Sequence, residues 1–402
     1  MSNRTHDTDD KSLRGLHRDC LDLLKQLIAI PSFSKEEEGT ARLLETWLTA
    51  KGVRTHRVQN NVWARNEHFN PALPTILLNS HHDTVRPNKA YTLDPFAALE
   101  IGEKLYGLGS NDAGGCLVSL IATFLHFYPR RDLSHNLTLA LTAEEEISGH
   151  NGIEMLLPTL GPIEWGIVGE PTRLQLAVAE KGLLVLDCTA HGTAGHAARE
   201  EGDNAIYKAM KDIEWFRAYR APKVSGLLGP VKMSVTVIDT DNRAHNVVPA
   251  HCHFVVDVRV NECYTFEELL DIIRANTTCE VTPRSLRMRS SGIPLTHPVV
   301  ESGIRLGRKC YGSPTTSDKA LMPFPALKTG PGDSARSHTA DEFIFVAEIA
   351  DGIRHYIDLL TPILTSPPAG SPAAGTPAPV DPPSPAPDWP HPSSPPGKTS
   401  HK

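Results

Sequence analysis

The chain has 402 residues and a net charge of −7, so it is long enough to form two folded units with sizeable cores. Its basic residues are scattered, which argues against a nucleic-acid binder and leaves small polar molecules as the expected partners. Seven cysteines without a CxxC pair indicate neither a disulfide framework nor a thiolate zinc site, and the lack of a signal-like or membrane-spanning apolar run predicts a cytoplasmic protein with no membrane partner.

The first part of the chain alternates between helical and strand patterns. Apolar residues at helical spacing predict helices over 13–28, 41–48 and 117–125. Short apolar runs predict strands at 75–78, 137–141 and 165–168. This alternation is typical of an α/β domain with a mostly parallel sheet flanked by helices.

From about Ala177 the order changes to strand, helix, strand, strand, helix, strand. These elements are expected at 184–188, 206–216, 231–239, 252–260, 266–275 and 286–288. The order matches a ferredoxin-like α+β unit, so we expect 177–288 to be a lid or dimerisation domain inserted into the first domain. Thr265 with Glu268 forms a capping box at the start of its second helix.

The catalytic domain is therefore expected to be discontinuous, formed by 1–176 and 289–364. Thr339 with Glu342 predicts a capping box at the start of its last helix, which ends near Leu364. Residues 365–402 are rich in Pro, Ala, Ser and Gly and have almost nothing to bury, which predicts a disordered tail with polyproline II character. Its PxxP-like segments are of a kind that binds partner proteins, but the favoured interpretation is that the tail is dispensable.

Polar residues follow the predicted strands at their carboxyl ends, which is where open α/β sheets bind ligands. They are His81, Asp83, Glu145, Glu146 and Glu170. The adjacent carboxylates at 144–146 are costly beside a buried strand unless a cation or a proton compensates them, the alternative being a solvated acidic turn. Imidazole and carboxylate groups suit zinc, and one carboxylate often bridges a hydrolytic metal pair.

Side chains alternate along a strand, so His81 and Asp83 are expected on one side and His82 on the other. Asp83 is then placed to accept the imidazole N–H of His81 and to set its tautomer. His82 is expected to have a structural role.

Eight short motifs together resemble the M20 family of metallopeptidases and amidohydrolases, and within it the acetylornithine deacetylases. The motifs are Ser80-His81-His82-Asp83-Thr84-Val85, Ser110-Asn111-Asp112-Ala113-Gly114-Gly115, Ala143-Glu144-Glu145-Glu146, Gly169-Glu170-Pro171-Thr172, Gly195-His196-Ala197-Ala198, Asn246-Val247-Val248-Pro249, Asp257-Val258-Arg259 and Ser337-His338. The resemblance runs from about Asp10 to Leu364 and includes the order of the domains.

The resemblance implies a site with two zinc ions, with cobalt as a possible substitute. It implies that His81 and Glu170 bind one ion, that Glu146 and His338 bind the other, and that Asp112 bridges them. Glu145 is then the general base and Asp83 a second catalytic residue. The substrate-binding residues that it implies lie in the inserted domain. They are His196, Asn246 and Arg259.

In a homodimer formed through the inserted domain, the resemblance implies that His196 reaches the site of the partner. Two alternatives stay open from the residues themselves. Arg259 is equally suited to a salt bridge with Asp257, and Asn246 to an ordinary turn.

The expected function is the metal-dependent hydrolysis of an N-acyl amino acid, with N-acetylornithine or an acetyl- or succinyl-citrulline of arginine biosynthesis as the substrate. A succinyl-diaminopimelate desuccinylase, a dipeptidase or a carboxypeptidase is the alternative within the family, and a non-catalytic binding protein on the same fold is an alternative of another class. Departures from the family pattern leave the substrate open. They are 113–115 after Asp112, 197–201 after His196, and Thr316-Ser317-Asp318.

Overall fold

The computed structural model describes residues 2–199 and 201–365, with side chains from Leu13 onwards. The chain divides into a compact unit of residues 1–366 and a second unit of residues 367–402. Apart from Thr365, the predicted Pro-rich tail 365–402 therefore lies outside the described residues. Within the described ranges, no helix combines the length and the apolar character that a membrane crossing requires.

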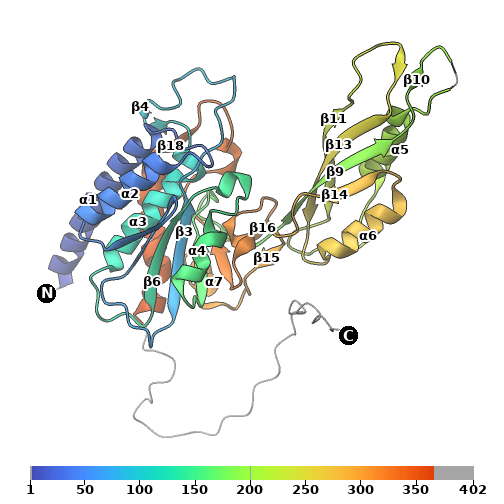
Figure 1. The fold of residues 1–402 in the computed structure, drawn as a ribbon. Helices are drawn as coiled ribbons and strands as arrows, with labels where there is room; N and C mark the ends of the chain where they lie inside the picture. The colour runs from blue at the N-terminus through green and yellow to red at the C-terminus, as the bar shows by residue number, and fades with distance from the viewer. Residues whose placement is uncertain (1, 200, 366–402) are drawn as a thin grey trace, which may run out of the picture. The chain divides into compact units, whose positions relative to one another are not determined.

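The larger sheet has nine strands, and its central strands are parallel (Figure 1). The order is β1-β2-β6-β3-β7-β17-β8-β15, and β16 also pairs with β8. Strands β6, β3, β7 and β17 pair in parallel, whereas β1, β2 and β15 join their neighbours antiparallel. The strands are β1 (Thr55–Val58), β2 (Asn61–Arg65), β3 (Thr75–His81), β6 (Asn136–Thr142), β7 (Trp165–Val168), β8 (Leu176–Glu180), β15 (Ser291–Gly292), β16 (Cys310–Ser313) and β17 (Ala326–Lys328). The predicted α/β fold with a mostly parallel central sheet is confirmed.

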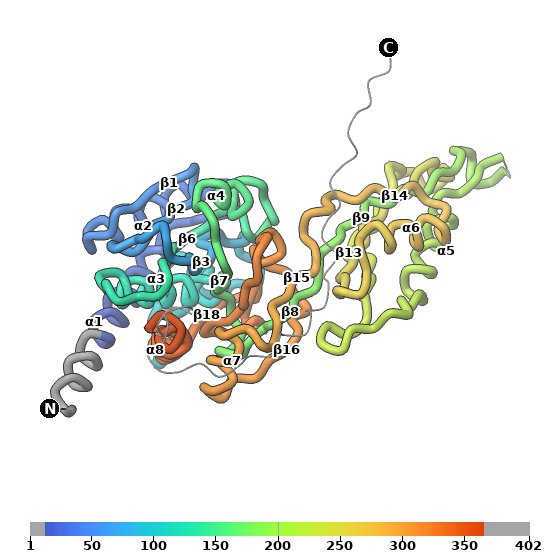
Figure 2. Tube along the Cα trace, turned by 90° about the horizontal axis from the view of Figure 1, so that it is seen from below, coloured from blue at the N-terminus to red at the C-terminus, as the bar shows by residue number. Residues whose placement is uncertain are grey.

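Helices cover both faces of this sheet because successive side chains of each strand point in opposite directions. Ile76 and Leu78 of β3 belong to the large apolar core with α1, α3 and α8, whereas Leu77 packs in a smaller core with α4. Helices α1, α3 and α8 lie against one another (Figure 2). The helices of this part are α1 (Ser2–Ile28), α2 (Glu38–Ala50), α3 (Gly115–Phe127), α4 (Ile153–Leu160), α7 (Pro298–Arg305) and α8 (Val346–Leu364).

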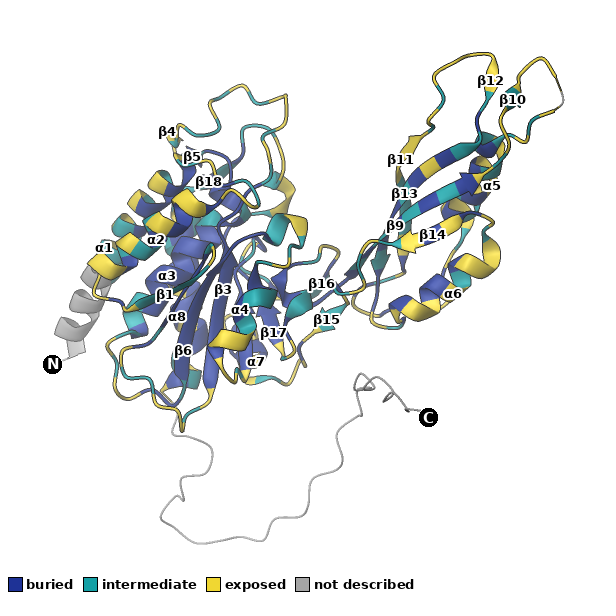
Figure 3. Cartoon of the chain, viewed as in Figure 1, coloured by how far each residue is buried: buried dark blue, intermediate teal, exposed yellow. Residues whose placement is uncertain are grey.

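The central strands are buried along their whole length, as Figure 3 shows by colour. Each fully buried leucine or isoleucine stabilises the fold by about 1.5–3 kcal/mol relative to an exposed one. The strands therefore form a rigid support. The loops at their carboxyl ends begin at fixed positions.

A separate antiparallel sheet has the order β11-β13-β9-β14 and its own apolar core. Its elements in chain order are β9 (Gly182–His191), α5 (Ala205–Ala218), β11 (Lys232–Asp239), β13 (His251–Val260), α6 (Phe266–Asn276) and β14 (Glu280–Pro283). This is the ferredoxin-like order predicted for the inserted unit. Asn204 caps α5, and the predicted capping box of Thr265 and Glu268 is present at α6. The division into a discontinuous catalytic domain and an inserted lid or dimerisation domain, with its boundaries, stays a prediction.

Two predicted elements are wrong. The last strand of the ferredoxin-like unit is β14, not 286–288, because Val281 is the residue that is buried there, whereas Leu286 is exposed. Thr339 and Glu342 do not cap the last helix. Residues Phe343–Phe345 instead form strand β18, which pairs with β5 (Lys104–Tyr106), and β5 also pairs with β4 (Leu99–Ile101). Helix α8 starts after β18, where Glu348 accepts the backbone N–H of Phe345.

Candidate active site

The polar residues singled out in the sequence gather at the carboxyl ends of the central strands. His81 is the last residue of β3, and Glu144 to Glu146 follow the end of β6. Glu170 follows β7, and Asp112 lies in the turn Ser110–Gly114 that leads into α3. His338 comes from the long segment after β17. Parallel pairing of these strands brings their carboxyl ends to one edge of the sheet, so residues distant in sequence become neighbours.

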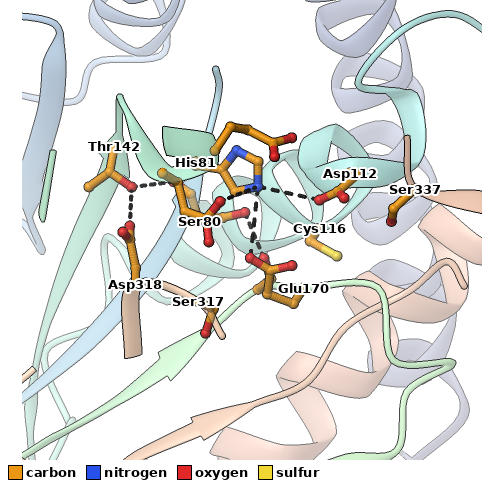
Figure 4. A network of polar contacts seen from close by, with 12 residues as sticks. Ser80, His81, Asp112, Cys116, Thr142, Glu170, Ser317, Asp318 and Ser337 are labelled. Atoms are coloured by element: carbon orange, nitrogen blue, oxygen red, sulfur yellow. Dashed lines mark hydrogen bonds and ion pairs between the residues drawn. The ribbon is translucent and has the colours of Figure 1, made fainter. Parts of the chain in front are cut away.

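One group of potential metal ligands surrounds His81 (Figure 4). Its Nε2 atom lies 3.4 Å from Asp112 Oδ1 and 3.8 Å from Glu170 Oε1. The same nitrogen is buried and has no hydrogen-bond partner among the described residues. A buried polar atom without a partner is costly, and a cation between these three groups would satisfy it.

A second group shares Asp112 with the first. His338 Nε2 lies 2.9 Å from Glu146 Oε2 and 3.7 Å from Asp112 Oδ2. Asp112 therefore directs one carboxylate oxygen towards each histidine. Within each group the potential ligand atoms lie within 4.8 Å of one another. Imidazole and carboxylate donors of this kind fit a pair of divalent cations such as zinc.

The electrostatics of the site also favour a cation. Burial, followed by repulsion from Asp112, raises the pKa of Glu170 to about 8. Burial likewise raises the pKa of Glu145 well above its usual range, although His81 acts in the opposite direction. Carboxylates crowded in a buried space need either protons or a cation to offset their charge. The donor set therefore fits metal ions on charge as well as on ligand type.

Asp83 holds the backbone of the acidic loop. Its Oδ1 and Oδ2 atoms accept the backbone N–H groups of Glu145 and Glu146, both at 3.1 Å, and Ser34 donates its hydroxyl at 2.7 Å. The nearest acceptor to His81 Nδ1 is the backbone carbonyl of Asp83 at 3.1 Å, and the carboxylate is at 3.4 Å. The predicted contact between the two side chains is thus present but longer than the one to the backbone.

The three consecutive glutamates have separate surroundings. Glu145 Oε2 lies 4.0 Å from His81 Nε2, and Glu146 contacts His338. Glu144 instead has φ 56° and binds Asn151, whose side-chain amide donates at 2.8 Å. The solvated acidic turn considered from the sequence does not fit, because Glu144 is buried and Glu146 faces a histidine.

His82 has the structural role expected of it. Its Nδ1 atom lies 2.9 Å from Thr40 Oγ1, and its Nε2 atom lies 2.9 Å from the carbonyl of Asn60. Both ring nitrogens are therefore occupied on the side away from the ligand groups.

A pocket that is open to solvent borders both ligand groups. Asp112, Glu145, Glu146, Glu170 and His338 form one part of its lining. The other part is a wall of hydroxyl groups, which sequence reasoning missed. It consists of Tyr311, Ser313, Thr315 and Thr316. Only β16 and the segment after it, neither of them predicted, bring these residues to the site.

Asp318 is a further buried carboxylate next to the site (Figure 4). Thr142 donates its hydroxyl to Asp318 at 2.8 Å, and burial raises the pKa of Asp318 to about 7. In the sequence, Thr316-Ser317-Asp318 was noted as a departure from the family pattern. That departure did not indicate that Asp318 lies beside His81.

The predicted substrate residues of the inserted unit do not line this pocket. His196, in the short strand β10 (Gly195–His196), is exposed, and Asn246 precedes its partner strand β12 (Val247–Val248). Arg259 donates to the carboxylate of Asp257 at 2.8 and 3.0 Å, which is the alternative considered from the sequence. Its remaining Nη1 atom lies 3.5 Å from Thr316, a residue of the pocket wall.

Curated relatives of this chain carry the name succinyl-diaminopimelate desuccinylase. The chain is 29% identical over 344 residues to a succinyl-diaminopimelate desuccinylase of Cereibacter sphaeroides, covering 79% of this chain and 87% of the relative. A desuccinylase of the same name from Parvibaculum lavamentivorans is 28% identical over 268 residues, covering 61% and 67%. These names differ from the acetylornithine deacetylase expected from the sequence.

The fold resembles that of a dinuclear metal-binding peptidase of the M20 family from Bacillus subtilis. The TM-score is 0.66 at 16% identity, and the match covers 87% of this chain and 99% of the other. The model of peptidase family M20/M25/M40 matches residues 77–361, which is more than half of the chain. The chain is therefore a hydrolase that belongs to peptidase family M20/M25/M40.

Proposed function

We propose that the protein is a metal-dependent deacylase that hydrolyses the amide bond of an N-acyl amino acid. The observation that carries the proposal is the position of Glu145, a carboxylate that lines the pocket beside two ligand groups sharing Asp112. A protein that only bound a ligand would have no need of a base at that point. The binding-protein alternative is therefore disfavoured.

The residues can be assigned roles in such a hydrolysis. His81 and Glu170 would hold one zinc or cobalt ion, Glu146 and His338 a second, and Asp112 both. When bound, the ions would polarise the amide carbonyl and lower the pKa of the attacking water. Glu145 Oε2 would accept the proton of that water and return it to the nitrogen of the leaving amine.

We take N-acetylornithine or an N-acylcitrulline as the first candidate substrate. The resemblance seen in the sequence supports it, and so does the charge of the pocket. Among the described residues that line the pocket, Lys328 is the only lysine or arginine. Its ammonium contacts Glu180 at 3.1 Å and the carbonyl and hydroxyl oxygens of Thr315, both at 3.2 Å. All three N–H donors of Lys328 are thus bound to protein oxygens, so Lys328 is not free to bind a carboxylate in the acyl group of the substrate. This disfavours a succinyl group.

N-succinyl-diaminopimelate is the second candidate, because relatives of this chain carry the name desuccinylase. Its acyl carboxylate would need a cation from outside the described pocket lining. The basic groups near the hydroxyl wall are Arg259, which is paired with Asp257, and Lys181, which lies between β8 and β9 and donates to the carbonyl of Pro230 at 2.6 Å. Lys232 of β11 is close to Lys181. The two candidates therefore differ in whether the inserted unit supplies positive charge to the acyl group.

A substrate panel tests the proposal. The zinc-loaded or cobalt-loaded protein is incubated with N-acetylornithine, N-acetylcitrulline, N-succinylcitrulline, N-succinyl-diaminopimelate and a dipeptide, and the released amino acid is quantified. Preference for an acetyl substrate supports the first candidate, and preference for N-succinyl-diaminopimelate supports the second. Turnover of the dipeptide alone would identify a peptidase and overturn the deacylase proposal.

A homodimer formed through the inserted unit belongs to the same proposal. The unit exposes large apolar side chains on α5 and on the edge strand β11. They are Tyr207, Met210, Val237 and Ile238, with exposed fractions of 72, 57, 52 and 55%. An exposed apolar patch beside an unpaired strand edge is typical of a protein interface. A partner subunit would explain how His196 and Asn246, which lie outside the pocket lining of one chain, reach a site.

A further inference from the structure

Glu342 is a buried carboxylate bound to the backbone of the loop that carries Asp112. Its exposed fraction is 2%. Glu342 Oε1 accepts the backbone N–H of Asn111 at 2.8 Å and that of Asp112 at 2.9 Å. Glu342 Oε2 accepts the N–H of Gly109 at 3.1 Å. Buried N–H groups need acceptors, so one side chain satisfies three backbone donors of this loop.

Strand pairing determines where Glu342 lies. Phe343, the next residue, pairs with Tyr106 in the antiparallel ladder of β18 and β5. One step further along the ladder, the carbonyl of Glu342 accepts the N–H of Gly107 at 3.0 Å. Glu342 therefore stands opposite the start of the loop. Gly109 has φ +74°, a conformation that favours glycine and turns the loop back towards the carboxylate.

The same segment binds the loop at a second point. The Asn111 side-chain amide donates to the carbonyl of Asp333 at 3.0 Å, and its Oδ1 accepts the Asp333 N–H at 3.0 Å. Residues 333–342, which include His338, are thus attached to the loop at both ends. These contacts hold the backbones of Asp112 and His338 in one arrangement.

We propose that Glu342 is a positioning residue for Asp112. By binding the backbone N–H of Asp112 and of its neighbours, it orients the Asp112 carboxylate so that each oxygen faces one histidine. Asp83 has the same relationship to Glu145 and Glu146, so each of the two carboxylates fixes the backbone of one ligand loop. The inference rests on the proposed metal-dependent function and adds to it a residue that maintains metal affinity.

The competing reading is that Glu342 serves only general stability. The adjacent Asp341 provides a matched control, because its carboxylate also accepts backbone N–H groups, from Thr92 and Leu93, both at 2.9 Å. Those donors lie in a different loop. A substitution that acts only through stability should have similar effects at both positions, whereas positioning of Asp112 should depend on Glu342.

Cobalt titration of the full-length protein separates the two readings. The metal-free wild type, Glu342→Gln and Asp341→Asn are titrated with Co²⁺ against a chromophoric chelator, and the visible spectrum of the bound metal is recorded. Glutamine keeps the shape of the side chain but replaces one acceptor oxygen with an amide donor. We expect Glu342→Gln to weaken Co²⁺ binding by about 10–100-fold and to alter the spectrum, as loss of a residue that orients a ligand does.

For Asp341→Asn we expect affinity within about twofold of wild type, since its carboxylate binds the backbone of Thr92 and Leu93 and not the loop that carries Asp112. Circular dichroism and thermal unfolding of the metal-free proteins show that each is folded, and Glu342→Asp replaces Glu342→Gln if the latter does not fold. Unchanged cobalt affinity in the folded Glu342 variant, or an equal loss in Asp341→Asn, would overturn the inference alone. Failure of the wild type to bind cobalt would overturn the proposed function together with it.

Discussion

Asp112 Oδ1 lies 3.4 Å from His81 Nε2, a buried nitrogen without a hydrogen-bond partner in the part of the chain that the structure describes. The other oxygen of Asp112 faces His338 at 3.7 Å. Asp112 thus joins the two ligand groups into one site. Its carboxylate is therefore expected to affect both metal binding and turnover.

Asp112→Asn should remove metal from both groups. The substitution replaces one carboxylate oxygen with an amide nitrogen that is a poor ligand and removes the negative charge between the two histidines. We expect bound zinc to fall from two ions per chain to one or none, and turnover to fall by roughly 10³-fold or more, because several kcal/mol of transition-state stabilisation are lost. Metal analysis after dialysis and initial rates provide the measurement.

The control for this prediction is Asp271→Asn, which neutralises an exposed carboxylate on α6. It should keep the metal content and the rate of the wild type. Full metal content in Asp112→Asn would contradict the assignment of Asp112 as a shared ligand.

Glu145→Gln should abolish turnover without removing metal. Glutamine occupies nearly the same volume but does not accept the proton of the attacking water, and general-base catalysis typically contributes about 10²–10⁴-fold. We expect a loss of that size with two metal ions still bound, measured by initial rates and metal analysis of the same sample. Turnover within about tenfold of wild type would refute the assignment.

The adjacent Glu144→Gln is the matched control, because Glu144 binds Asn151 and does not line the pocket. Its carboxylate accepts two hydrogen bonds from Asn151. We expect its effect to appear in the free energy of unfolding, by about 1–3 kcal/mol, with turnover affected far less than in Glu145→Gln.

Val237→Lys should disrupt the proposed homodimer. Val237 lies on the edge strand β11 with an exposed fraction of 52%, and lysine at a strand edge opposes pairing with another chain. We expect sedimentation to show a monomer where the wild type is a dimer, and turnover to fall if His196 acts on the site of the partner. Ile101→Lys, at an equally exposed position on β4, should leave the dimer intact. Dimers in both variants would place the interface elsewhere.

Protonation of His355 on unfolding should reduce the free energy of unfolding at acidic pH. His355 is 2% exposed, its Nε2 lies 3.1 Å from Thr329 Oγ1, and burial, with a smaller contribution from Arg308, lowers its pKa to about 3. In the unfolded chain its pKa is about 6.5. Below that pH the unfolded state binds a proton that the folded state does not bind until about pH 3, so the free energy of unfolding decreases as the pH falls.

The comparison variant is His355→Gln, which lacks this titration. Urea unfolding of both metal-free proteins between pH 5.5 and 4.5 should show that the wild type loses about 1.4 kcal/mol per pH unit more than the variant. Using the difference between the two proteins cancels the other titrating groups. Parallel pH dependence would show that His355 is protonated in the folded state.

The long apolar patterns of the sequence were sufficient to predict the main elements. The stripe of α1, the buried runs of β3, β6 and β7, and the capping box of Thr265 and Glu268 appear as expected, because each depends on local periodicity or on a local hydrogen bond. Glu342 shows the limit of that reasoning. Its spacing from Thr339 is typical of a capping box. Because β18 pairs with β5, however, the Glu342 carboxylate accepts the backbone N–H of Asp112 instead.

Periodicity and the order of the elements were enough to predict the α/β class and the ferredoxin-like order of the second sheet, whereas the metal ligands Asp112 and His338 were expected only from the family resemblance. The roles of these residues depend on how the chain folds. Asp112 faces both histidines, Glu144 is turned towards Asn151, and Asp83 binds the backbone of the acidic loop. The hydroxyl wall of the pocket was likewise invisible beforehand. The physical reason is that residue types and periodicity are local properties, whereas the distance between two side chains depends on how distant strands pair and where their loops turn.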